Sequence, residues 1–173
     1  MSELTTLHTA ITEAVQAAMP LLATVGAYAE ATEGTALPAL FHSITDMRSG
    51  TDPGDGRSAV IATVRARITV ATGTPQARLH AGMLAAQLID LLRQQRWGLD
   101  FVEGACNVHA STDASTGAVA GDVTWNVQWE QVVLLGRTEW PWPDQPPGTL
   151  AFAFSPDTGP AHKDAYQAPE DLA

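Results

Sequence analysis

The residues of this 173-residue chain that come closest to a catalytic pair are Cys106 and His109, a thiol nucleophile and a candidate general base. Nucleophilic catalysis needs the two side chains within hydrogen-bond reach of each other. Successive side chains of a strand point to opposite faces, so a spacing of three residues in a strand separates this pair. We therefore expect no joint action of the two. We expect Cys106, the single cysteine, to be a small buried side chain without a disulfide partner.

The stretch from Asp46 to Arg57, DMRSGTDPGDGR, has the spaced aspartates of a cation-binding loop. A calcium loop of the EF-hand type needs a bidentate acid at its twelfth position, where this loop has arginine. We interpret it instead as a flexible loop that becomes ordered against a partner. His42 has no second metal-type residue at a useful spacing, so we interpret it as an ordinary strand residue, and His8 as a partly exposed helical one.

Other motifs of catalysis or cofactor binding are absent from the sequence. It contains no Gly-rich phosphate loop, no GxSxG elbow, no HExxH and no paired CxxC. We therefore expect no enzymatic activity, no cofactor and no metal ion.

The charge of the chain limits its partners, because it has 19 acidic side chains and only 9 basic ones, which gives a formal net charge of −10. Binding to a phosphate backbone draws its affinity from many cationic contacts, so we expect DNA to slide past this protein without being held. The N-terminus lacks the basic and apolar regions of a signal peptide, and no run approaches the roughly 18 apolar residues of a membrane span. These features predict a soluble protein that binds no membrane.

The strongest predicted element is a long strand from Ala118 to Leu135, AVAGDVTWNVQWEQVVLL. Apolar and polar side chains alternate along it, which is the period-two pattern of a sheet with one wet face. The predicted buried face holds Val119, Val123, Trp125, Val127 and Trp129. Beyond Glu130 the apolar residues become consecutive, so both faces of that end are expected to be covered.

The remaining elements are two helices and several shorter strands. A helix is predicted over about residues 3–19, capped by Ser2, and a longer one over about 75–97, opened by Thr74 and Pro75 and stopped by Gly98. Arg93 and Arg96 would lie in the last turn of the longer helix. Strands are predicted at 21–28, 37–45 and 59–70, with a short piece within 99–109. The prediction is an α+β domain: a mostly antiparallel sheet of about four strands, covered by two helices.

The composition changes after residue 137, which divides the chain into a domain at 1–137 and an extension at 138–173. The extension is acidic, contains most of the prolines and includes the sequence Trp140-Pro141-Trp142-Pro143. Such a segment favours extended polyproline geometry. We expect a Pro-rich C-terminal arm that buries no core of its own and carries one apolar island, Leu150 to Phe154.

The order of these elements resembles the tail-terminator (tail-completion) proteins of long-tailed bacteriophages. The matching pieces are LPALF at 37–41, the glycine-rich loop at 46–56, RQQRWG at 93–98, and WEQ at 129–131 followed by Leu135-Gly136. The resemblance covers about residues 3–136 and does not include the extension.

This resemblance implies a structural virion protein, usually a hexameric ring, that caps the tail tube and provides the head–tail joining surface. A repeated head-to-tail contact closes into a ring when its rotation divides a full turn. The implied partners are further copies of the chain, the tail tube protein, a head–tail connector or neck protein, and DNA that passes through the lumen without specific binding. The implied location is the tail–neck region of the virion, after assembly in the host cytoplasm.

Two alternatives remain open: another neck or head–tail connector adaptor component, and a stand-alone interaction module that uses the extension's tryptophans as a ligand. The candidate residues for subunit or tail-tube contact lie in the loop, on the polar face of strand 59–70 and in the extension. They are Asp46, Arg48, Asp52, Asp55, Arg57, Arg65, Arg67, Trp140, Trp142, Phe152 and Phe154. The extension is expected to lie along an adjacent subunit or neck protein and to add a strand to its sheet edge.

Overall fold

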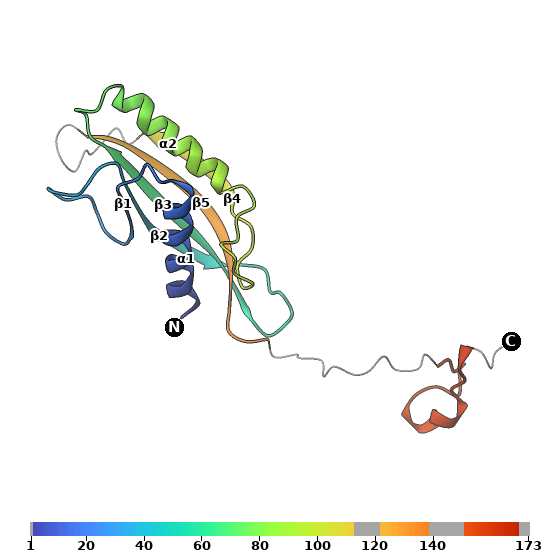
Figure 1. The fold of residues 1–173 in the computed structure, drawn as a ribbon. Coiled ribbons are helices and arrows are strands. Elements are labelled where there is room, and N and C mark those ends of the chain that lie inside the picture. The colour runs from blue at the N-terminus through green and yellow to red at the C-terminus, as the bar shows by residue number, and fades with distance from the viewer. Residues whose placement is uncertain (1, 113–121, 139–150, 170–173) are drawn as a thin grey trace. The chain divides into compact units, whose positions relative to one another are not determined.

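A computed structural model describes residues 2–112, 122–138 and 151–169 of the chain. The chain divides into two compact units, Met1–Glu139 and Trp140–Ala173. The first unit is α+β, as the sequence predicted (Figure 1). In chain order its elements are α1 (Glu3–Ala18), β1 (Thr24–Ala27), β2 (Ala39–Ser49), β3 (Ser58–Val70), α2 (Ala77–Leu91), β4 (Cys106–Thr112) and β5 (Val123–Leu135).

The strands form one five-stranded sheet in the order β1-β2-β3-β5-β4. Strand β1 runs parallel to β2, and the other neighbours are antiparallel. The sheet is therefore mixed, and the expectation of about four mostly antiparallel strands was close but incomplete. A period-two pattern identifies a strand but not its direction, and here residues 28–38 carry the chain back so that β1 and β2 point the same way.

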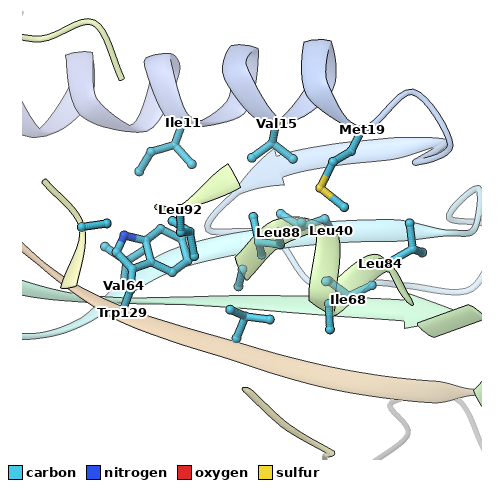
Figure 2. Close-up of a cluster of buried hydrophobic side chains, with 14 of the residues drawn as sticks. Ile11, Val15, Met19, Leu40, Val64, Ile68, Leu84, Leu88, Leu92 and Trp129 are labelled. Atoms are coloured by element: carbon cyan, nitrogen blue, oxygen red, sulfur yellow. The ribbon is translucent and has the colours of Figure 1, made fainter. Parts of the chain in front are cut away.

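Both helices lie over the same face of this sheet, and one core fills the space between them. Val64, Ala66 and Ile68 of β3 share that face and are fully buried. Figure 2 shows side chains converging on it from α1 (Ile11 and Val15), from α2 (Leu84 and Leu88) and from Leu92, the C-cap of α2. The predicted inward face of β5 is thus confirmed for its described residues, since Val127 and Trp129 belong to the core and Val123 and Trp125 pack against it. The opposite face carries no helix among the described residues.

Helix α1 follows its sequence signals closely. The Ser2 side chain accepts a hydrogen bond from the Thr5 N–H, which is the expected cap. Leu7, Ile11 and Val15 form the buried stripe. Glu3 accepts a hydrogen bond from the Gly136 N–H (3.2 Å), and hydrogen bonds from its own N–H and that of Gly136 lower the pKa of Glu3. The start of α1 is thereby tied to the end of β5.

Helix α2 is shorter at both ends than predicted. Its N-cap is Gln76, in the left-handed region (φ 54°) and without a side-chain cap, and the helix ends at Leu91. Arg93 and Arg96 therefore lie beyond the last turn, and the prediction that they complement the helix dipole was wrong. The chain turns through Gln94 and Trp97, which also have left-handed φ values. Their neighbours make tertiary contacts, described below, that a continuing helix would not allow.

Several strand boundaries also differ from the prediction. Strand β2 runs on to Ser49, so Asp46 and Arg48 belong to a strand and only residues 50–57 form the loop. Strand β5 begins at Val123, and the predicted residues 118–121 lie outside the described part of the chain.

The second unit is described from residue 151 to 169. Phe152 exchanges both backbone hydrogen bonds with Gln167 (2.9 Å each), and η1 (Pro160–Ala165) is a short 3-10 helix between them. None of the side chains described in this stretch is fully buried. Across all described residues, no helix has the length and apolar character needed to cross a membrane.

Candidate functional site

Four of the predicted contact residues lie together on the sheet face that the helices leave open: Asp46, Arg48, Arg65 and Arg67. Strict alternation from Leu40 would have turned Asp46 toward the core. A β-bulge between Ile44 and Asp46 inserts one extra residue, and beyond it Asp46 pairs with Thr63. One added residue reverses every later side chain of a strand, so the bulge turns both charged residues outward.

Two arginines of this open face, Arg48 on β2 and Arg65 on β3, bond to side chains of β5. Arg48 donates two hydrogen bonds to the Glu130 carboxylate (3.0 and 2.9 Å), and Asn107 donates a third (2.7 Å). Arg65 makes a longer hydrogen bond to the Gln128 amide oxygen (3.3 Å). Arg65 and Arg67 also line a hollow of about 210 Å³ with Glu30, Phe41 and Ser43 among the other lining residues. The open face is therefore a polar surface on which arginine and carboxylate side chains both occur.

The charged side chains of the loop at 50–57 bond mainly within the loop. The Asp52 carboxylate accepts from the Gly54 N–H (2.8 Å). Asp55 accepts from both the backbone and the guanidinium of Arg57, and these hydrogen bonds lower the pKa of the Asp55 carboxyl. The loop thus has internal turns, and its expected ordering against a partner stays a prediction.

The predicted aromatic residues of the extension divide between described and undescribed parts. Trp140 and Trp142 lie outside the described residues. Phe152 is 43% exposed and Phe154 72% exposed, which is unusual for side chains of this size. Tyr166 is also exposed in the same unit.

A second apolar surface, which the sequence reasoning missed, is the outer side of α2. Leu79 and Met83, one helical turn apart, are 59% and 55% exposed, and Ile89 is exposed further along. The inner side of the same helix is buried through Ala81, Leu84, Ala85 and Leu88. A signal existed in the sequence, because a helix that lies on a core normally carries polar residues on its outer side.

Cys106 and His109 lie on the same face of the sheet, whereas the sequence predicted opposite faces. Strand β4 has a register irregularity between these residues, and their partners are Glu130 and Gln128, which share one face of β5. Both residues therefore lie on the open face of the sheet. Cys106 is exposed rather than buried, and its thiol points to the Glu130 backbone oxygen (3.6 Å). The prediction of opposite faces failed because period-two reasoning assumes an unbroken ladder.

His8 and His42, interpreted separately in the sequence, meet in the structure. Their Nδ1 atoms are 3.4 Å apart, and the rings are near parallel (20°). His42 is buried, and its Nε2 lies 2.9 Å from the Thr12 hydroxyl. His8 Nε2 lies 3.1 Å from the Tyr28 hydroxyl. Burial lowers the pKa of His8, and burial together with the His8 charge lowers the pKa of His42 to about 4.

A further buried polar cluster surrounds Gln131, which is fully buried on the core face of β5. Its amide oxygen accepts from the indole N–H groups of Trp97 (2.8 Å) and Trp129 (3.2 Å). Its amide nitrogen donates to the backbone oxygens of Gln95 and Glu103 (2.9 Å each). The signal in the sequence was the position of Gln131, two residues after Trp129, which places it on the same inward face of the strand.

The described residues contain no group of three or more histidine, cysteine, aspartate or glutamate side chains placed to hold a metal ion. Comparison of the chain with protein-family models gives no match, and comparison with curated proteins gives none either. The geometry of the surfaces therefore carries the functional argument.

Proposed function

We propose that this protein is a ring-forming structural protein of a phage virion, a tail terminator that caps the tail tube and provides the head–tail joining surface. It acts through contacts between copies of itself and with the tube and neck proteins, and it has no catalytic role. The element order from α1 to β5 and the glycine-rich loop before β3 follow the pattern on which the resemblance to tail terminators rests.

The observation that carries the proposal is the apolar outer side of α2. Leu79 and Met83 are exposed at a spacing of one turn on a helix that is already packed on its other side. Contiguous exposed apolar side chains mark sites where another protein surface excludes water. Exposed Arg78, Gln87 and Asp90 lie on the same helix, so the apolar contact that we propose for α2 is centred on Leu79 and Met83.

The second unit offers a surface that suits this helix. Phe152, Phe154 and Tyr166 are exposed aromatic side chains, and methionine sulfur packs favourably against aromatic rings. A contact between α2 of one copy and the second unit of the next copy uses two different patches of one chain. Such a heterologous contact repeats around a ring.

The charge of the chain fits a ring around passing DNA. With a formal net charge of −10, the assembled ring repels a phosphate backbone and does not hold it. The arginines of the open sheet face are few and in contact with neighbouring side chains. They suit the carboxylates of an adjacent protein better than a run of phosphates.

Light scattering across concentration, with and without tail-tube protein, tests the proposal. A mass near that of a hexamer of 18.3 kDa chains, alone or on the tube, supports it. A protein that stays monomeric and does not bind the tube protein at any concentration refutes the proposal.

A variant tests the α2 contact separately. Leu79→Asp combined with Met83→Asp places two charges on the apolar surface, and we expect it to abolish the assembled mass while leaving the thermal unfolding midpoint almost unchanged. Gln16→Asp on the exposed side of α1 is the control and should assemble normally. An intact ring in the double variant excludes α2 as the contact without excluding the ring.

A further inference from the structure

We propose that the facing Nδ1 atoms of His8 and His42 form an acid-sensitive latch, which holds α1 on the sheet at neutral pH and releases it on acidification. The latch joins three elements, because His8 belongs to α1, His42 to β2, and Tyr28 follows directly after β1. It does not depend on assembly of the protein.

The hydrogen bonds define where the protons lie. The Thr12 hydroxyl donates to the His8 backbone oxygen (2.9 Å), and it has only one proton to donate. Thr12 must therefore accept from the Nε2–H of His42 (2.9 Å). A neutral imidazole has one N–H, so the Nδ1 atom of His42 is an acceptor.

The remaining bonds follow from this tautomer. The Nδ1–H of His8 points at the bare Nδ1 of His42 (3.4 Å), and the Nε2 of His8 accepts from the Tyr28 hydroxyl (3.1 Å). The two Nδ1 atoms lie much closer together than the ring centroids, which are 5.3 Å apart, so these atoms face each other. In the neutral state every polar group of the network has a partner.

The network accepts one proton but not two. A proton on Nε2 of His8 only requires the Tyr28 hydroxyl to turn and become the acceptor. A second proton, on Nδ1 of His42, would place two N–H donors and two positive charges face to face. His42 therefore takes its proton when the contact opens and both rings become hydrated.

Charged groups lie on both sides of the pair. Glu13 lines a groove with His8 and Thr12 on the α1 side, and Glu30, Arg65 and Arg67 line a hollow with His42 on the sheet side. Burial is the largest cause of the lower pKa of both rings, and the two rings differ in how far they are buried. His42 is 1% exposed, whereas His8 is only half-buried.

The size of the expected effect follows from the folded and released states. In the released state His42 has its ordinary pKa of 6.5, whereas in the folded state its pKa is about 4. A histidine whose pKa is lower in the folded state stabilises that state at pH values above its ordinary pKa. This stabilisation is lost as the pH falls toward the folded-state pKa. Between pH 7.5 and 5.5 the opening equilibrium should therefore rise about tenfold from His42 alone.

Hydrogen exchange of the backbone amides, corrected for the intrinsic rate at each pH, measures this opening. We expect the α1 amides of the wild-type protein to lose about tenfold in protection between pH 7.5 and 5.5, and β3 amides to lose less. In His42→Leu the pH dependence of α1 should fall to the smaller part that His8, whose pKa is also lowered by burial, contributes. In the control His109→Leu, an exposed site on β4, the full pH dependence should remain. An equal pH dependence in wild type and His42→Leu overturns the latch.

An NMR titration of the ring protons of the wild-type protein provides a test that needs no variant. We expect His42 to stay neutral down to pH 5.5 and His8 to titrate with a midpoint below 6.5. A midpoint for His42 at or above 6.5 overturns the proposal.

Discussion

Replacement of Gln131 by leucine tests whether the buried tryptophan cluster stabilises the fold. The substitution keeps a side chain of similar size but removes one acceptor and one donor group. The indole N–H groups of Trp97 and Trp129 lose their acceptor, and the Glu103 backbone oxygen loses its side-chain donor. The Gln95 oxygen loses the same donor but keeps the Ala105 N–H (3.0 Å).

The cost is estimated from the groups left without a partner. An unsatisfied buried donor or acceptor costs about 1–3 kcal/mol, and three such groups, less the gain from burying an apolar side chain, give about 4 kcal/mol. For a domain of this size the slope in urea is about 2 kcal/mol per molar, so the unfolding midpoint should fall by about 2 M. Tryptophan fluorescence follows the transition, since two indoles belong to the cluster.

Two further variants separate the polar network from general packing. Gln128→Leu, on the open face of the same strand, loses only the 3.3 Å bond to Arg65 and should cost less than about 1 kcal/mol. Gln131→Glu keeps an acceptor for the indoles but brings a carboxylate next to the backbone oxygens of Gln95 and Glu103. Its folded-state pKa should be raised, so this variant should gain stability relative to wild type as the pH falls from 7.5 to 5.5.

A midpoint for Gln131→Leu within about 0.5 M urea of wild type would refute the reasoning, because it would mean that the cluster adds no net stability. A Gln131→Glu variant whose stability relative to wild type does not change with pH would refute the assignment of the amide nitrogen as the donor to both backbone oxygens.

Two other predictions concern single side chains. Ser2→Ala removes the acceptor for the Thr5 N–H and should cost about 1 kcal/mol in urea unfolding; no loss would mean that α1 begins without its cap. Cys106 is exposed, so a thiol-specific reagent should label the native protein without denaturant, and labelling that requires unfolding would contradict the exposed position.

Much of the fold could be predicted from local patterns. Alternation identified β5 and its inward face because β5 pairs with β3 in one long ladder without a register shift. The Ser2 cap placed the start of α1 correctly for a similar reason, since this signal lies next to the element that it caps.

The failures share a physical cause, which is that a tertiary contact or one inserted residue outweighed a local preference. The bulges at Ile44/Asp46 and Cys106/His109 each reversed the faces that alternation predicts. Helix α2 stops at Leu91, and the chain beyond it bonds through Gln95 and Trp97 to a glutamine on β5 that is distant in sequence. Periodicity carries no information about such partners.

The same reasoning explains why the histidine latch acts on α1 in particular. This helix attaches to the core through a short apolar stripe, and each fully buried aliphatic side chain contributes about 2 kcal/mol before the entropy of ordering the helix is subtracted. The net attachment is therefore small, and a polar contact across α1, β1 and β2 is a large part of it. β3, in contrast, pairs with a strand along each edge and packs under both helices. Loss of the His8–His42 contact should thus release α1 while the sheet stays folded, which is why exchange measured separately in α1 and β3 distinguishes the latch from global acid unfolding.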